Sequence, residues 1–360
     1  MKNLFLLILI SIFISCNQNK ETKSYTIDGK IEGVSSGYAI LEYSDFKDTT
    51  EIMNGQFIFE GKLQKPEVCI IRISGCELHK EFYIENSKIS FFGHIDSLDK
   101  VKISGSKTEN EWISYNILLS EYDEKYKSIR SEYKLADEDR KAELIKINEQ
   151  IELEQAEAQK SFIKKNPSSY LCINILWEID WSFNSAFEYN EYIDILDTSL
   201  NNYKRLIDLK ELVGRMEKVE LGQIAPDFEV NDIDGELIRL SDLYSTSNYL
   251  LLDFWASHCG PCRKENAHIK EAYDKFHDKG FDVISVSTDT KKEFWASAIK
   301  KDELTWTNVC NLKEWNDNEI VNMYALRQIS NNLLLDKKGK IIAKNLRGDD
   351  LFKKLDELIN

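Results

Sequence analysis

The sequence predicts an α/β domain in the C-terminal part of the chain, preceded by a small all-β domain and a helical region. Three patterns support this order: short alternating apolar runs over residues 25–106, helical periodicity over 107–220, and strand-like runs alternating with helix-like runs over 221–360. A chain of 360 residues is long enough for two or three domains, each with its own core.

The charge of the chain bears on its partners. It carries 62 acidic and 47 basic residues, which gives a formal net charge of -15. The two signs are mixed along the sequence, whereas a nucleic-acid-binding protein needs a basic stripe or patch. We therefore expect no nucleic-acid partner. The expected partners are small molecules, proteins or envelope components.

The N-terminal residues predict export. Lys2 supplies a positive charge, and residues 4–13 form an uncharged apolar run that is too short to span a bilayer stably. Residues 1–15 are therefore expected to be a signal peptide. The end of this segment, Phe13-Ile14-Ser15-Cys16, resembles a lipobox, in which the cysteine is acylated and becomes the mature N-terminus, although Phe13 replaces the usual leucine.

We expect Cys16 to be a lipid anchor, with residues 16–24 as a lipidated tether. A plain signal peptide followed by an incidental cysteine is the alternative. No later apolar run approaches the roughly 20 residues of a transmembrane helix. The rest of the chain is therefore expected outside the cytoplasm, in the cell envelope and facing the periplasm.

The all-β prediction for residues 25–106 rests on short runs separated by turn residues such as Asn54-Gly55. These runs cover residues 25–27, 38–41, 56–59 and 89–92.

Residues 107–220 predict a helical region. Two amphipathic helices are expected between 109 and 165, with a break near Ala136-Asp137. Their apolar stripes either pack against each other in an antiparallel hairpin or form a dimerisation seam. The following segment also has a helical pattern, and we expect its aromatic residues to lie in the core: Trp177, Trp181 and Phe183.

The α/β prediction for residues 221–360 follows from the order of its runs. Strands are expected over 228–230, 237–240, 249–255, 281–287, 333–336 and 341–345, and helices from Pro261 and from Lys291. The last two strands form a hairpin that turns at residues 337–340. Parallel strands with crossover helices imply a layered α/β domain.

The cysteine pair Cys259-Gly260-Pro261-Cys262 follows the apolar strand 249–255 and opens a helix. Helix-end amides and the helix dipole favour a thiolate at the first cysteine, and the thiolate is the nucleophile in disulfide exchange. Cys259 would attack a substrate disulfide, and Cys262 would then resolve the mixed disulfide. Half of a zinc site is the alternative, but the chain has no second pair of ligands at the customary spacing, so we expect no metal.

The stretch from Asp253 to Arg263 closely resembles the active-site sequence of thioredoxins. Together with Ala225-Pro226-Asp227-Phe228 upstream and with residues 334–336 and 339–341 downstream, it resembles the TlpA/ResA-like branch of that superfamily. The resemblance covers residues 222–360 and implies a thioredoxin fold, thiol-disulfide exchange in the envelope and no bound cofactor. The preceding β-rich domain resembles a domain of unknown function that often precedes thioredoxin-like domains in envelope lipoproteins.

The resemblance also indicates residues that assist the pair. Asp253 matches a buried aspartate of the family, where it could accept the Cys262 proton, although an aspartate at a strand end could also face solvent. Glu265 matches an acidic position that modulates the pair, and an exposed helix glutamate is the alternative. His258 replaces the usual tryptophan, and its cation would stabilise a Cys259 thiolate unless it is a solvated rim residue. Trp255 is expected to pack beneath the site.

Two prolines of the family pattern are missing. Ala267 stands where the family has a proline in the active-site helix, so we expect an unkinked helix. Ser330 stands where the family has a cis-proline, so we expect a trans Ile329-Ser330 bond and a changed loop beside the cysteines, with weaker reductase activity. The other cysteines, Cys69, Cys76, Cys172 and Cys310, are expected to be buried thiols, with a Cys69–Cys76 disulfide as a further option.

The leading hypothesis is therefore a membrane-anchored thiol-disulfide oxidoreductase that reduces disulfides of exported proteins. Its expected partners are disulfide-bearing envelope proteins, an upstream thiol reductant and the membrane that holds its lipid anchor. A peroxiredoxin-like peroxidase is a second hypothesis, although Ala256 occupies the position of the threonine that peroxiredoxins place before their reactive cysteine. A third is an envelope binding protein with a weakly active thioredoxin-like domain.

Overall fold

A computed structural model describes residues 24–359 of the chain. Contacts between Cα atoms divide it into two compact units, one containing residues 24–162 and 169–174 and the other containing residues 163–168 and 175–359. The expected signal peptide and Cys16 lie outside the described residues. Within those residues, no helix has both the length and the apolar composition needed to cross a membrane.

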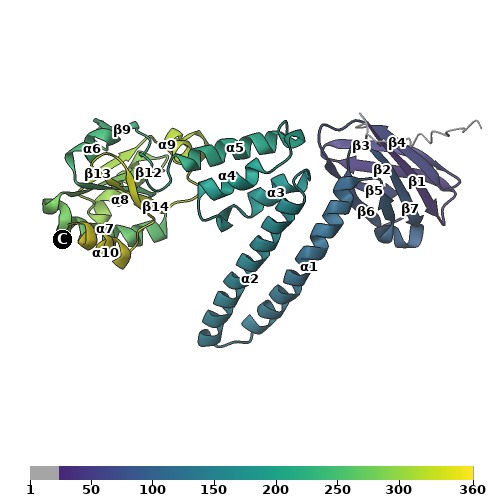
Figure 1. Cartoon of the computed structure of the whole chain (residues 1–360), viewed down its shortest axis with the longest axis horizontal. Helices are drawn as coiled ribbons and strands as arrows, with labels where there is room; N and C mark the ends of the chain where they lie inside the picture. The colour runs from purple at the N-terminus through teal and green to yellow at the C-terminus, as the bar shows by residue number, and fades with distance from the viewer. Residues whose placement is uncertain (1–23, 360) are drawn as a thin grey trace, which may run out of the picture. The chain divides into compact units, whose positions relative to one another are not determined.

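The first unit begins with a β-sheet, which confirms the all-β prediction (Figure 1). Its eight strands follow the order β6-β5-β2-β3-β4-β1-β7-β8. Alternate side chains point inward, and Phe57, Phe59, Phe82 and Phe91 lie in the resulting core. The strands are β1 (Tyr25–Glu32), β2 (Ser36–Tyr43), β3 (Phe46–Met53), β4 (Gln56–Gly61), β5 (Glu67–Ile73), β6 (His79–Ile84), β7 (Lys88–His94) and β8 (Lys102–Ser104).

The first unit also contains the long helix α1 (Lys107–Tyr133) and most of the long helix α2 (Glu138–Lys165). They lie side by side as a hairpin, and the predicted break falls between them (Figure 1). The Tyr122 hydroxyl donates to the Glu154 carbonyl at 3.2 Å, and Gln159 Nε2 donates to the Tyr115 hydroxyl at 2.5 Å. The helices therefore pack against each other within the chain, as the hairpin interpretation predicts.

The next helices are α3 (Leu171–Glu178), α4 (Ala186–Asp194) and α5 (Lys204–Glu217). The ring of Phe183 stacks on Tyr189 with 4.2 Å between centroids, and the Tyr189 hydroxyl donates to the Leu176 carbonyl at 2.6 Å. The core prediction for Trp181 is wrong, because 54% of this residue is exposed. It lies in a short 3-10 turn after α3, Asp180–Ser182, in which none of the residues is buried.

The second unit contains a five-stranded sheet with the order β13-β12-β11-β14-β15. Strands β11 to β13 are parallel, and β14 and β15 run antiparallel to their neighbours. The predicted bounds of β11 and β12 are confirmed. The strands are β11 (Tyr249–Trp255), β12 (Phe281–Ser287), β13 (Thr307–Cys310), β14 (Asn331–Asp336) and β15 (Ile341–Lys344), with a separate small ribbon of β9 (Glu229–Asn231) and β10 (Leu237–Arg239).

Helices cover both faces of this sheet, so its strands are buried on both sides. Apolar residues of α7, α8 and α10 pack on one face. Residues of α6, α9 and the segment around Phe228 pack on the other. The helices are α6 (Leu240–Thr246), α7 (Gly260–Phe276), α8 (Lys292–Asp302), α9 (Glu319–Met323) and α10 (Asp349–Ile359).

Candidate active site

Cys259 and Cys262 form a disulfide at the point where β11 leads into α7. Cys259 is the N-cap of the helix, and its Sγ accepts the backbone amide of Cys262 at 3.2 Å. The amides of a first helical turn have no partner within the helix, so one of them is available to this sulfur. Cys262 is only 2% exposed, whereas Cys259 is half-buried. The two sulfurs therefore differ in access to solvent, as the spacing predicts.

Asp253 lies on β11 and is 2% exposed, so the alternative of a solvent-facing aspartate is excluded. The Ser285 hydroxyl donates to its Oδ2 at 3.4 Å. The pKa of Asp253 is raised to about 7, first by burial and then by the neighbouring Glu265 carboxylate, against the opposing effects of the Ser285 hydroxyl and the Arg347 guanidinium. This carboxyl group can therefore exchange a proton near neutral pH.

Glu265 lies one turn after Cys262 and is 9% exposed, so the interpretation as an exposed helix glutamate is wrong. Its Oε1 accepts the Gly348 amide at 2.8 Å, and its Oε2 lies 3.2 Å from His268 Nδ1. The loop before α10 covers the glutamate, and this loop was not predicted from the sequence. Glu265 therefore ties α7 to the C-terminal part of the domain.

Trp255 is fully buried at the end of β11, and the packing prediction for it is confirmed. It shares an apolar cluster with Cys262, Phe276 and Trp295. The active-site helix α7 is continuous from Gly260 to Phe276, as expected from Ala267.

The Ile329-Ser330 peptide bond is cis, so the expectation of a trans bond is wrong. Ile329 packs against the apolar clusters on both faces of the sheet. The guanidinium of Arg347 donates to the Ser330 carbonyl, and Ser330 is 5% exposed. The residue on each side of this bond is therefore held by contacts with other parts of the domain. These contacts are made by Ile329 and by Arg347, and neither of them requires a proline at position 330.

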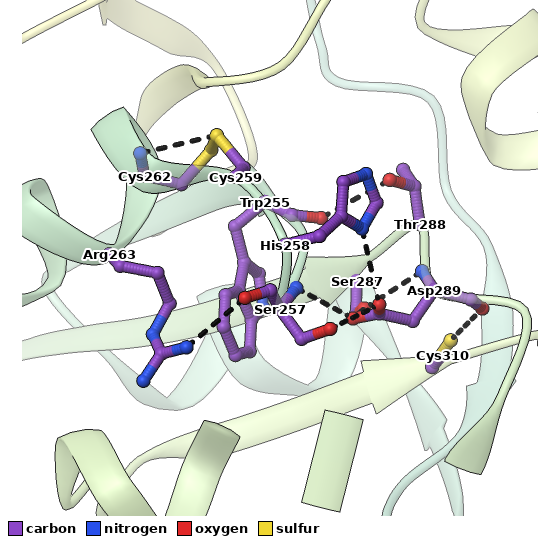
Figure 2. Close-up of polar contacts among 10 residues, drawn as sticks. All are labelled: Trp255, Ser257, His258, Cys259, Cys262, Arg263, Ser287, Thr288, Asp289 and Cys310. Atoms are coloured by element: carbon purple, nitrogen blue, oxygen red, sulfur yellow. Dashed lines mark hydrogen bonds and ion pairs between the residues drawn. A yellow bond between two sulfur atoms is a disulfide. The ribbon is translucent and has the colours of Figure 1, made fainter. Parts of the chain in front are cut away.

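The rim of the site is formed by His258, whose side chain is 75% exposed. Figure 2 shows its ring turned toward Asp289, with 3.6 Å between Nδ1 and Asp289 Oδ1. Asp289 follows β12 and also binds Ser257, which precedes His258. Sequence reasoning assigned no role to Asp289, because its partners come from a different loop.

A groove of about 1000 Å³ opens beside this rim. Its walls include Ser257, His258, Asp289, Phe294, Gln328 and Ile329. The groove therefore joins the residues before Cys259 to the loop that contains the cis bond.

The other cysteines within residues 24–359 form no disulfide, so the Cys69–Cys76 option is wrong. Cys69, Cys172 and Cys310 are buried, as predicted, and Cys76 is partly buried. Burial raises the pKa of the Cys172 thiol to about 12 and also raises the pKa of Cys69 and Cys310. Such thiols are poor nucleophiles. Over the same residues, no cluster of three or more His, Cys, Asp or Glu side chains is arranged to hold a metal ion.

A central parallel β-strand that leads through a cysteine pair into a helix, with a buried aspartate on that strand, defines a thioredoxin-like redox domain. Comparison with known proteins agrees. Residues 221–344 match the AhpC/TSA family, and residues 25–112 match a domain of unknown function (DUF4369).

The chain is 30% identical over 128 residues to the thiol-disulfide oxidoreductase ResA of Bacillus cereus (strain ZK), a match that covers 36% of this chain and 70% of that protein. It is 29% identical to the ResA of another B. cereus strain (ATCC 10987 / NRS 248) over 146 residues, covering 41% of this chain and 80% of that protein. The thioredoxin domain of a Bacteroides vulgatus thiol-disulfide oxidoreductase is 35% identical, with 39% of this chain and 99% of that domain covered and a TM-score of 0.37. The 30% identity to ResA, over 70% of that protein, shows that this chain belongs to the ResA-like thiol-disulfide oxidoreductases.

Proposed function

We propose that this chain is a membrane-anchored reductase for disulfides of exported proteins, with Cys259 and Cys262 as its redox pair. The observation that carries the proposal is the position of Cys259 Sγ, which lies at the start of α7 and accepts the Cys262 amide. An amide and a helix dipole directed at this sulfur favour its thiolate after reduction. The lower exposure of Cys262 leaves Cys259 as the sulfur that a substrate can reach.

In the first step, the Cys259 thiolate attacks one sulfur of a substrate disulfide. The substrate S–S bond breaks, a mixed disulfide forms, and the other substrate sulfur leaves as a thiolate that takes up a proton. In the second step, the Cys262 thiol loses its proton and attacks Cys259 Sγ. The bond between Cys259 Sγ and the substrate sulfur then breaks, this substrate sulfur leaves as a thiolate that takes up a proton, and the pair is left as the Cys259–Cys262 disulfide. A thiol reductant returns the pair to the dithiol state.

Asp253 is the group that we assign to accept the Cys262 proton. A pKa of about 7 lets its carboxylate take up a proton at neutral pH and return it later in the cycle. The negative charge of Glu265 contributes to the raised pKa of the Asp253 carboxyl group. Trp255 supports Cys262 by packing in the same apolar cluster, and Ser330 is buried next to Ile329, which lines the groove.

We place this activity in the cell envelope, facing the periplasm, with the chain held to a membrane through acylated Cys16. The support is the lipobox-like sequence at residues 13–16. Replacing Cys16 by Ser tests this part: the protein should move from the membrane fraction to the soluble fraction. Retention in the membrane by the Cys16→Ser protein would contradict lipid anchoring at this residue.

Insulin reduction in the presence of dithiothreitol tests the proposed activity. The wild-type protein should accelerate precipitation of the insulin B chain, and Cys259→Ser should reduce the rate to that of dithiothreitol alone. Cys310→Ser is a matched control, because it removes a buried thiol from the same domain. A Cys259→Ser variant as active as the wild type would contradict the proposal.

Two alternative functions, a peroxidase and a binding protein, are distinguished by further assays. A peroxidase would consume hydrogen peroxide at the expense of the dithiol, but Ala256 is buried three residues before Cys259 and has no hydroxyl group for a peroxide. A binding protein would show no insulin reduction although Cys259 and Cys262 are intact.

A further inference from the structure

A chain of hydrogen bonds between buried side chains leads to the Asp253 carboxylate. Trp306, which directly precedes β13, donates its indole Nε1–H to the Ser285 hydroxyl at 2.8 Å. The Ser285 hydroxyl in turn donates to Asp253 Oδ2 at 3.4 Å. Trp306 is 5% exposed, and Ser285 is fully buried. Buried polar groups require hydrogen-bond partners, and in this chain each side chain supplies a partner for the next.

The register of the sheet places this chain on the same side as the redox pair. Asp253 and Ser285 are paired residues of the parallel strands β11 and β12. Side chains alternate between the two faces of a strand, so Asp253 points to the same face as Trp255. Trp255 packs in the apolar cluster that also contains Cys262 and Trp306. The chain therefore lies on the face of the sheet against which Cys262 packs.

The indole group of Trp306 determines how the Ser285 hydroxyl can act. An indole N–H is a donor only, so Ser285 Oγ is the acceptor of that bond. A hydroxyl group has one proton, and the acceptor that this proton reaches is Asp253 Oδ2. Donation to a carboxylate stabilises its ionised form. The direction of the chain therefore favours the carboxylate of Asp253 over the neutral acid.

The other groups that face Asp253 act on it in both directions. Burial raises the pKa of this carboxyl group most, the Ser285 hydroxyl lowers it, Glu265 of α7 raises it, and Arg347, in the loop before α10, lowers it. On its other neighbouring strand, β14, Asp253 is paired with the uncharged Asn332. Ser285 is therefore a group that both favours ionisation and forms a hydrogen bond with the carboxylate.

We infer that Trp306 and Ser285 are positioning residues that stabilise the ionised, proton-accepting form of Asp253. The inference rests on the proposed role of Asp253 as the acceptor of the Cys262 proton. Ser285 acts by direct donation. Trp306 acts through Ser285, because its indole N–H keeps the hydroxyl group directed at the carboxylate. Together they offset part of the effect of burial, so that more of the carboxyl group is ionised at a given pH.

The test is an NMR titration of the Asp253 carboxyl carbon in the oxidised full-length protein over pH 4 to 10. The signal is assigned by its loss in Asp253→Asn, and the cysteines of the Cys259–Cys262 disulfide do not titrate. We expect Ser285→Ala to raise the midpoint of the titration by about half a unit to one unit, because the carboxylate loses its donor. Trp306→Phe should raise the midpoint by less, and it should have no further effect in Ser285→Ala.

Ser287→Ala is the matched control. It removes a buried hydroxyl group from the same strand, and that hydroxyl donates to Asp289 instead (Figure 2). The midpoint of Asp253 should be the wild-type one in this variant. An unchanged midpoint in Ser285→Ala would overturn the inference. So would an equal shift by Trp306→Phe in the presence and absence of the Ser285 hydroxyl, because the indole would then act by another route.

The wild-type protein provides a second measurement if Trp306→Phe fails to fold. The indole N–H signal of Trp306 should shift with pH at the same midpoint as the Asp253 carboxyl carbon, because the hydroxyl that joins them responds to the charge of the carboxylate. This shift should be absent in Asp253→Asn. A Trp306 signal that does not change with pH in the wild type would overturn the role of the indole.

Insulin reduction separates this inference from the proposed function. Wild-type reduction of insulin together with an unchanged Asp253 midpoint in Ser285→Ala would overturn only the roles of Ser285 and Trp306. If the midpoint rises but the pH dependence of insulin reduction by Ser285→Ala stays that of the wild type, the assignment of Asp253 as proton acceptor is contradicted. Loss of the insulin reaction in the wild-type protein would instead contradict the redox role of the cysteine pair.

Discussion

The carboxyl group of Asp253 links the stability of the domain to pH. Below pH 3.8, the ordinary pKa of this group, both the folded and the unfolded state hold the proton. Between that value and about 7 the folded state keeps the proton while the unfolded state loses it, so the free energy of unfolding falls as the pH rises. Above pH 7 the free energy of unfolding falls no further on account of this group. The total decrease is on the order of 4 kcal/mol, because each unit of difference between the two pKa values contributes about 1.36 kcal/mol.

Asp253→Asn should therefore change the pH dependence of stability. The amide does not ionise. Between pH 4 and pH 8 the free energy of unfolding of the oxidised variant, measured in urea, should therefore decrease by roughly 3–4 kcal/mol less than that of the wild type. Asp282→Asn, a change on the neighbouring strand β12 at a less buried position, is the control. Parallel pH profiles for the Asp253→Asn protein and the wild type would show that Asp253 does not have a raised pKa.

The individual site residues differ in how far the sequence reveals them. Cys259 and Cys262 are close in sequence and follow a recognisable strand, so local spacing is sufficient to predict their disulfide. Asp289 contacts Ser257 across 32 positions of sequence, and no local pattern indicates such a contact. The Ile329-Ser330 bond was predicted wrongly from the missing proline, which is a local signal, and the contact of the Ser330 carbonyl with Arg347, 17 residues away, is also one that no local pattern indicates.

The helices and strands also differ in how well local sequence patterns predict them. Strands β11 and β12 were predicted with their observed bounds because each is an apolar run that is buried on both faces. Strand β13 was missed because it has only four residues, one of which is Asn308. Helix α10 was missed although its apolar residues recur at helical spacing, with Leu351 and Leu355 buried against the sheet.

Helix α7 is the element that carries the redox pair, and its continuity can be tested at Ala267. Ala267→Pro should destabilise the domain by about 3 kcal/mol, because proline removes a helical hydrogen bond and its ring clashes with the preceding turn. Thermal unfolding measures this effect, and Ala267→Ser is the control, since it keeps the backbone amide. Equal unfolding temperatures for the Pro and Ser variants would show that the helix accommodates a proline at this exposed position.

The second compact unit of the chain includes more residues than the segment that matches the AhpC/TSA family. It includes α4 and α5, whereas the family match begins at residue 221. Glu220 accepts the Ala186 amide at 2.9 Å and forms a 3.4 Å ion pair with Lys344 of β15. Val219 is buried in the same apolar cluster as Phe228 and Phe254. These contacts join the helical segment to the redox domain.

Two fragments test this larger unit. Residues 163–360 contain the whole second unit, whereas residues 222–360 lack α4, α5 and Val219. We expect the longer fragment to be more stable by at least about 2 kcal/mol, because the shorter one exposes the apolar surface that Val219 and its neighbours cover. Urea unfolding of the two oxidised fragments provides the comparison. Equal stability would mean that the helical segment is an independent addition.

The most direct test of the redox role of the pair is to trap a mixed disulfide. Reduced full-length Cys262→Ser is mixed with a disulfide-bonded peptide, and the products are analysed by mass spectrometry after digestion. The peptide should be attached to Cys259, because the attacking sulfur is present and the resolving sulfur is not. Cys259→Ser under the same conditions should retain no peptide. Attachment to a different cysteine, or equal trapping by both variants, would contradict disulfide exchange through Cys259.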